Sequence, residues 1–155
     1  MKPTPHTHLK YKLCISGAAE TDRCAPETAE RTRELGKQVV LHKAVLVTGA
    51  TTGAPYWAAI GAKDAGGFVI GVSPAASEIE HVKKYKLPLD YHDIIIYTGF
   101  GYSGRNLLLT RSSDAVLISC GAGAGAGEGE GGWGAGAARA TGFSAAGSAF
   151  LTAGA

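Results

Sequence analysis

The 155-residue sequence is poor in cysteine, in net charge and in long apolar runs, and each shortage excludes a class of protein. Its three cysteines, Cys14, Cys24 and Cys120, are widely spaced and form no C-x-x-C pair. We therefore expect neither a disulfide framework nor a zinc site, and we interpret Cys14 and Cys120 as small buried residues at strand positions. The five histidines show no H-x-x-x-H or H-E-x-x-H spacing, so we predict no metal site.

The charge is nearly balanced, with 15 Lys and Arg against 13 Asp and Glu. Domains that bind nucleic acid usually carry a clear basic excess, so we expect no nucleic-acid partner. No apolar run approaches the roughly 20 residues that cross a bilayer. The polar start MKPTPHTHLKYK also lacks the apolar core of a secretory signal. We therefore expect a soluble, cytoplasmic protein with no membrane partner.

Short apolar runs alternate with helical segments through most of the chain. The predicted strands are residues 12–16, 44–49, 68–74, 93–100 and 115–119, and the predicted helices are residues 26–43, 54–66, 76–85 and 103–114. The strands are rich in Val, Ile and Leu, which is typical of parallel strands buried on both faces. The alternation predicts an α/β fold, a Rossmann-like doubly wound parallel sheet of about five strands with helices on both faces.

The composition divides the chain into three parts. Residues 1–11 are predicted to form a flexible N-terminal tail, and residues 12–120 a Rossmann-like nucleotide-binding domain. Residues 121–155 hold 12 Gly and 12 Ala but no Val or Ile, so they offer no further buried strand, and the fold is expected to be C-terminally incomplete. One hypothesis is that this Gly/Ala-rich tail is a shifted reading frame of a G+C-rich gene, which sequencing the gene would test.

Glycine-rich turns follow the first four predicted strands. Ligands of open parallel sheets bind at the carboxyl ends of the strands, where backbone N–H groups and helix N-termini favour phosphate. The turn TGATTGAP has no Walker lysine, which excludes a P-loop NTPase. The candidate phosphate-binding residues in these turns are Gly17, Ala18, Gly49, Thr52, Gly53, Gly71 and Pro74.

Arg105 and its neighbour Asn106 follow the fourth turn, in the first turn of the next predicted helix. A guanidinium there can clamp a phosphate through two hydrogen bonds, and a solvated surface arginine is the alternative. Glu20 and Glu128 are the carboxylates beside glycine-rich strand ends that can act as acid or base.

The segments VLVTGATTGAPYWAAIGAKDAGGFVIGVSP and GRNLLLTRSSDAVLIS resemble the LOG-type Rossmann proteins. That group, long labelled lysine decarboxylase-like, includes cytokinin-activating phosphoribohydrolases and molybdenum cofactor carrier proteins. The resemblance covers roughly residues 12–128. The spacing between the family's arginine, its aspartate and its signature P-G-G-x-G-T-x-x-E is kept at Arg105, Asp114, Gly121 and Glu128. The signature itself is degenerate, because Cys120, Ala122, Ala124 and Gly125 stand where the family has Pro, Gly, Gly and Thr.

The resemblance implies that Arg105 and Glu128 form a catalytic pair and that Gly121 helps to hold the phosphate. Asn106 stands where the hydrolases usually have lysine, which favours a carrier-like protein. Three hypotheses remain: a carrier of a phosphate-bearing, nucleotide-like ligand such as the molybdenum cofactor, a nucleoside 5′-monophosphate phosphoribohydrolase, or a truncated domain without activity. No cofactor is expected to be required, and the resemblance implies a homodimer or homotetramer. Lysine decarboxylation is discounted, because no lysine lies in a context suited to a Schiff base with pyridoxal phosphate.

Overall fold

The computed structural model of the chain describes residues 10–22 and 24–120, and strands and helices alternate strictly within them. In chain order the elements are β1 Lys12–Ser16, α1 Thr28–Leu41, β2 Val45–Thr48, α2 Ala54–Asp64, β3 Val69–Ser73, α3 Glu78–Lys83, β4 Ile94–Tyr97, α4 Gly101–Arg111 and β5 Ala115–Ile118. Each predicted strand and helix is present, and most are a few residues shorter than the sequence pattern indicated. The predicted α/β class is therefore confirmed.

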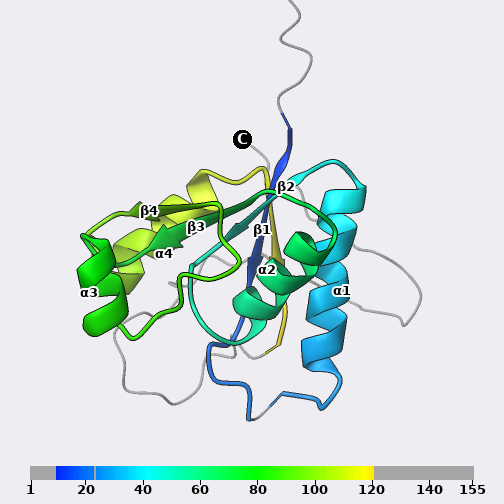
Figure 1. Ribbon diagram of the computed structural model, residues 1–155, viewed down its shortest axis with the longest axis horizontal. Helices are drawn as coiled ribbons and strands as arrows, with labels where there is room; N and C mark the ends of the chain where they lie inside the picture. The colour runs from blue at the N-terminus through cyan, green and yellow to red at the C-terminus, as the bar shows by residue number, and fades with distance from the viewer. Residues whose placement is uncertain (1–9, 23, 121–155) are drawn as a thin grey trace, which may run out of the picture.

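The five strands form one parallel sheet with the order β4-β3-β2-β1-β5. The chain moves outward from β1 to β4 and then crosses back, so that β5 pairs with the free side of β1. Helices α1 and α2 cover the near face in Figure 1, whereas α4 lies behind the sheet. This is the predicted doubly wound arrangement. Its topological switch point, where ligands of such sheets bind, lies between the carboxyl ends of β1 and β5.

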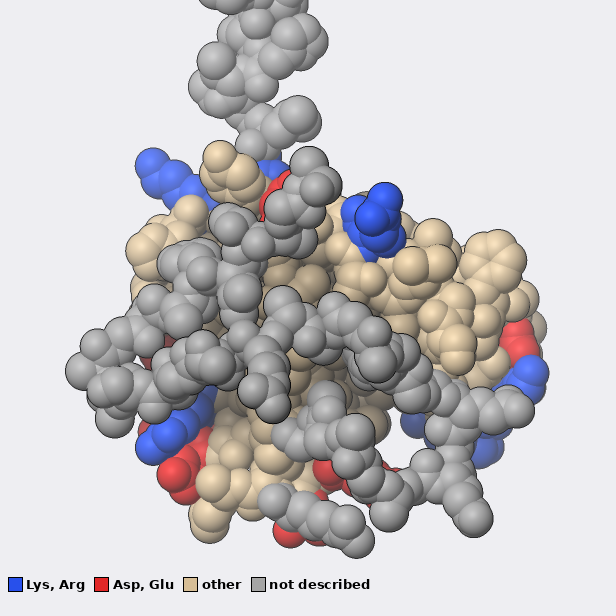
Figure 2. Space-filling view, turned by 180° about the vertical axis from the view of Figure 1, so that it is seen from behind, with Lys and Arg blue, Asp and Glu red and all other residues tan. Residues whose placement is uncertain are grey.

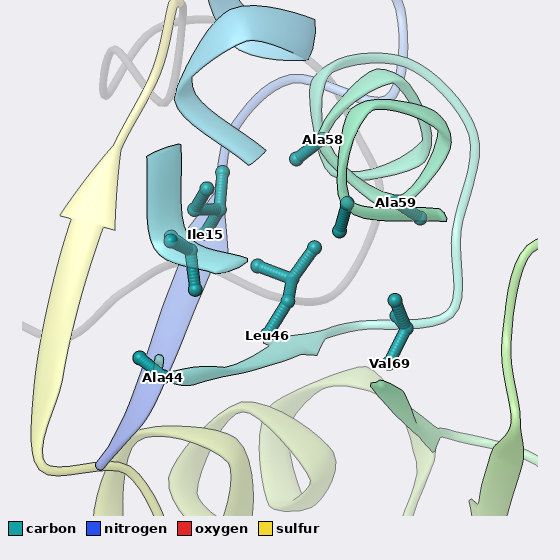
Figure 3. Close-up of a cluster of buried hydrophobic side chains, with 8 residues drawn as sticks. Ile15, Ala44, Leu46, Ala58, Ala59 and Val69 are labelled. Atoms are coloured by element: carbon teal, nitrogen blue, oxygen red, sulfur yellow. The ribbon is translucent and has the colours of Figure 1, made fainter. Parts of the chain in front are cut away.

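The core beneath α1 and α2 is made of small residues on the helices and larger ones on the strands. Ala58 and Ala59 of α2 point toward Leu46 and Ile15 of the sheet (Figure 3), and these residues are fully buried. The two helices also touch backbone to backbone, because a Cβ on Gly61 would overlap a carbonyl group of α1. The small residues therefore bring α1, α2 and the sheet close together.

The core beneath α4 is smaller and contains Cys14, Val47, Val72 and Leu109. Beside it the same side of the molecule leaves large apolar side chains exposed, on β4 and on the outer side of α4: Ile94, Ile96, Leu107 and Leu108. Figure 2 shows that charged side chains on this side lie mainly near the margins of the described surface. An apolar patch of this kind often marks a protein interface. The expected homodimer or homotetramer stays a prediction.

Neither membrane nor metal chemistry has a structural counterpart within the described ranges. None of the helices found there is both long and apolar enough to reach across a bilayer. Among the same residues, no group of three or more His, Cys, Asp or Glu side chains is arranged to hold a metal ion.

Candidate functional site

Turns from distant parts of the chain meet at the carboxyl ends of β1, β2 and β5. The Ala54 N–H at the start of α2 donates to the Ala18 carbonyl at 2.9 Å, and the Ala18 N–H donates to the Cys120 carbonyl at 2.9 Å. The Thr52 hydroxyl donates to the Ala19 carbonyl at 3.3 Å. The turn after β1 is therefore held between the turn after β2 and the end of β5. Four predicted residues, Gly17, Ala18, Thr52 and Gly53, lie in this cluster of turns.

The close packing of these turns explains two of the glycines. A Cβ on Gly17 would lie 2.8 Å from the Ala54 Cβ and overlap the Ser119 carbonyl. Gly53 has φ +72°, and a Cβ there would overlap the Ala18 carbonyl oxygen. Positive φ is strained for residues with a side chain. These glycines therefore allow backbone segments to approach one another, which is a structural role whether or not a ligand binds.

Arg105 projects from α4 toward the turn after β2 and is 6% exposed. Its Nη1 donates to the Gly49 carbonyl at 2.6 Å, and its guanidinium carbon lies 5.4 Å from the centre of the Tyr102 ring. A Cβ on Gly49 would overlap Nη1, so the glycine makes room for the guanidinium. The predicted alternative of a solvated surface arginine is wrong, because the helix turns this side chain inward.

The charge of Arg105 is incompletely compensated within the described ranges. No Asp or Glu there forms an ion pair with it, and the buried Nε–H has no hydrogen-bond acceptor. Burial lowers the pKa of the guanidinium, yet an arginine stays protonated at neutral pH. A buried cation with an unused donor is costly. Its chemistry suits an anion, and a phosphate can accept from a guanidinium at two oxygens.

Cys14 lies close enough to Arg105 for their charges to interact, and it is fully buried in β1. Burial raises the pKa of its thiol to about 12, and the nearby guanidinium only partly opposes that effect. The thiol is therefore protonated at neutral pH and unsuited to nucleophilic attack. The prediction that Cys14 is a buried apolar residue is confirmed.

Cys24 and Cys120 form a disulfide, which corrects two expectations from the sequence. We expected no disulfide and interpreted Cys120 as a buried residue in a strand, but it follows β5 and is bonded to Cys24 in the turn after β1. The two positions are 96 residues apart in sequence, and their Cα atoms are 5.8 Å apart. They meet because β5 pairs with β1, a contact that cysteine spacing does not reveal.

The other predicted residues have different surroundings. Gly71 lies inside β3, where a Cβ would come within 2.9 Å of Ala50 and His92. The Pro74 carbonyl accepts from the Gly101 N–H at 3.1 Å, so it helps to fix the start of α4 and with it Arg105. Asn106 is the next residue of α4.

Two predicted residues, Gly121 and Glu128, lie outside the described residues. Asp114, which keeps the family's spacing, has a structural role. Its carboxylate accepts from the Lys12 N–H at 2.7 Å and pairs with the Lys12 ammonium at 2.9 Å, which ties the start of β5 to β1. Glu20 lies exposed in the turn after β1.

Tyr102 is a site residue that the sequence reasoning missed. It lies one helical turn before Arg105 and stacks against the guanidinium, and its ring edge also meets Tyr85 at 5.4 Å between ring centres. The (i, i+3) spacing of an aromatic residue and an arginine on a predicted helix is the signal that indicates such a contact. Tyr102 therefore supports the buried cation from the side of α4.

Comparison with known proteins agrees with this geometry. The chain is 34% identical over 110 residues to an uncharacterized protein of Archaeoglobus fulgidus, covering 71% of this chain and 66% of that protein. The molybdenum cofactor carrier protein of Chlamydomonas reinhardtii has a similar structure, with a TM-score of 0.58 and 32% identity over 72% of this chain and 62% of the carrier. The molybdenum cofactor binding protein of Rippkaea orientalis gives a TM-score of 0.62 and 31% identity over 72% and 63%.

The chain thus spans slightly less than two thirds of the length of each of these relatives. The model of the SLOG cluster4 family matches residues 10–129, which include all the strands, the meeting turns and Arg105. These residues make up well over half of the chain, and the resemblance to LOG-type Rossmann proteins is confirmed. The chain belongs to the SLOG cluster4 family.

Proposed function

We propose that the protein binds a phosphate-bearing, nucleotide-like ligand at the carboxyl ends of β1, β2 and β5, with Arg105 as the phosphate-binding cation. The observation that carries this proposal is the burial of Arg105 with an unused Nε–H donor and no carboxylate partner in the described ranges. A phosphate supplies both the negative charge and the acceptor oxygens that this guanidinium lacks.

The similarity to two molybdenum cofactor proteins favours a carrier or binding function over a purely structural one. The molybdenum cofactor is a pterin with a phosphate group, so its phosphate suits the same cation. Asn106, beside Arg105, agrees with the carrier-like alternative that the sequence indicates. The cofactor would be cargo here, and no catalytic step of this protein depends on it.

A nucleoside 5′-monophosphate phosphoribohydrolase is the second candidate. It is supported by Arg105, which is buried at the expected edge of the sheet, and by Glu128, which keeps the spacing of the family's signature glutamate. In that reaction Arg105 orients the phosphate, while Glu128 stabilises the oxocarbenium-like transition state or positions water. The N-glycosidic bond breaks and releases the free base.

Calorimetric titration with AMP, adenosine and inorganic phosphate tests the binding proposal. AMP and phosphate are expected to bind, and adenosine is expected to bind much more weakly because it lacks the anion. Arg105→Met is expected to abolish phosphate-dependent binding. Arg111→Met, an exposed arginine of the same helix, is the matched control and is expected to bind like the unmodified protein. Equal affinity for AMP and adenosine would contradict the proposal.

Two further measurements distinguish the carrier from the hydrolase. Release of free adenine from AMP that disappears in Glu128→Ala supports the hydrolase, whereas binding without release supports the carrier. The molybdenum cofactor released from a molybdoenzyme is the second probe. Retention of its fluorescence with the protein through gel filtration, and loss of that retention in Arg105→Met, would identify the cargo.

A further inference from the structure

The segment of residues 84–93, here called the strap, links α3 to β4 and is anchored at its C-terminal end. The Asp93 carboxylate accepts from the Val69 N–H at 2.8 Å and from the Lys63 ammonium at 2.7 Å. These contacts join the end of the strap to both β3 and α2. The residue before it, His92, is thereby held over the sheet, where its ring lies against Gly71.

His92 makes two hydrogen bonds whose direction can be assigned. Its Nδ1 is 2.8 Å from the Asp90 carbonyl oxygen, which can only accept, so Nδ1 carries the proton. In the neutral ring Nε2 is then an acceptor, and it lies 2.8 Å from the Thr48 hydroxyl oxygen. Thr48 therefore donates its proton to His92. Its oxygen in turn accepts from the Ala50 N–H at 3.1 Å.

This chain of hydrogen bonds ends at the candidate phosphate site. Ala50 has φ 49°, a left-handed conformation that is unfavourable for alanine and needs support from its surroundings. The Thr48 hydroxyl supplies part of that support. The adjacent Gly49 carbonyl accepts from Arg105, so the conformation of the Gly49–Ala50 turn sets the position of the guanidinium.

Resting on the proposed function, we propose that His92 is a positioning residue for Arg105, acting through Thr48 and the Gly49–Ala50 turn, and that protonation of His92 weakens phosphate binding. In the protonated ring both nitrogens are donors. Thr48 then loses the acceptor for its own proton, in a place where Thr48 is fully buried. The turn loses a fixed partner, and Arg105 loses the position that its bond to Gly49 provides.

The charged groups around His92 come from several elements. Asp90 and Asp93 of the strap favour its protonated form, whereas His81 of α3 disfavours it. Lys63 of α2 reaches the same region and pairs with Asp93. Burial is the largest influence, and it lowers the pKa of His92 below the usual value. The relay is therefore intact at neutral pH and is broken under acidic conditions.

A second hydroxyl–histidine pair lies one strand away. The Ser73 hydroxyl oxygen is 2.7 Å from His81 Nδ1 and accepts from the Ala75 N–H at 3.0 Å, and His81 Nε2 donates to the Pro88 carbonyl at 3.0 Å. This pair connects the strap to the turn after β3. Because both histidines titrate in acid, the test must isolate His92 by substitution.

The experiment measures AMP affinity by calorimetry at about pH 7.5 and about pH 5.5 for the unmodified protein, His92→Gln, Thr48→Val and His42→Gln. The phosphate of AMP has a second pKa near 6, which affects every variant alike. The unmodified protein and His42→Gln, whose histidine is exposed at the end of α1, are expected to lose about tenfold more affinity on acidification than His92→Gln. Thr48→Val is expected to bind about tenfold more weakly at the higher pH and to lack the extra pH dependence.

The same pH profile in His92→Gln and in the unmodified protein would overturn the proposal. If AMP binds at neither pH, the proposed function fails, and the relay is judged in the unliganded protein by NMR. There the Ala50 amide and Arg105 Nε resonances are expected to shift with the protonation of His92 and to stay constant in His92→Gln. Resonances that do not follow His92 in the unmodified protein would overturn the relay even if a variant failed to fold.

Discussion

Replacing Arg105 by methionine is predicted to stabilise the fold while abolishing phosphate binding. Methionine keeps an unbranched stem in the space beneath Gly49 and removes the charge. The effective penalty of a buried ion is several kcal/mol. In the described ranges Arg105 recovers one charged hydrogen bond, to Gly49, which contributes about 1.5–3 kcal/mol, and one contact with the Tyr102 ring, which contributes about 0.5–2 kcal/mol.

The substitution also leaves the Gly49 carbonyl without its donor, which costs about 1–3 kcal/mol if water does not replace it. The balance of these contributions is a gain of about 1–2 kcal/mol in the free energy of unfolding. For a protein of this size that corresponds to a rise in Tm on the order of 5 °C. The direction is that expected where a binding site is maintained at a cost to stability.

Urea denaturation and thermal melts of Arg105→Met, with and without AMP, measure this balance. The ligand-free variant is expected to be more stable than the unmodified protein. AMP at 100 times its Kd is expected to raise the stability of the unmodified protein by about 2.7 kcal/mol and to leave the variant unchanged. A loss of several kcal/mol in the variant would refute the reasoning, because Arg105 would then be a structural residue whose charge is compensated. Arg111→Met is the control for loss of a positive charge from α4.

Three other predictions follow from the described contacts. Reducing the Cys24–Cys120 disulfide, which closes a loop of nearly 100 residues, is expected to lower the free energy of unfolding by about 4.7 kcal/mol in the chain-entropy model; urea midpoints with and without reductant check it, and an unchanged midpoint would contradict it. Gly61→Ala is expected to destabilise the protein although alanine favours helices by about 1 kcal/mol, because its Cβ would overlap a carbonyl of α1; a higher Tm would show that the helices can separate without cost. Hydrogen bonds from the Lys12 backbone and side chain lower the pKa of Asp114, so its contribution to stability is present above the unfolded pKa of about 3.9 and is lost as pH falls through the lower folded pKa; Asp114→Asn is expected to weaken the acid dependence of urea midpoints between about pH 5 and 2, and equal dependence in both proteins would contradict the assignment.

The fold was predictable from the sequence because its signals are local. Apolar runs such as residues 93–100 and the proline and glycine at their ends indicate where strands stop, and the alternation with helices indicates a parallel sheet. The glycine turns and Arg105 could be placed at the carboxyl edge of that sheet for the same reason. The direction of the Arg105 side chain was not predictable, since a weakly amphipathic helix leaves its buried side undefined until it packs against the sheet.

The contacts missed from the sequence all join residues that are distant in the chain. Cys24 meets Cys120 because β5 returns to β1, and His92 meets Thr48 because the strap folds back over β2. Their spacings carry no recognisable period, and a lone histidine or threonine has many possible surroundings. Only the packed chain decides which polar groups share a buried space and therefore which of them must be partners.

The amino-acid sequence by itself determined the order and type of the elements, the glycine turns between them and the presence of an arginine at the ligand-binding edge. Those properties depend on backbone propensity and on apolar patterning within a few residues. The tertiary structure decided that Arg105 is buried with an unused donor, that a disulfide closes across β1 and β5, and that His92 reaches the turn beneath the guanidinium. These properties depend on burial and on hydrogen-bond geometry, which arise only when distant segments pack together.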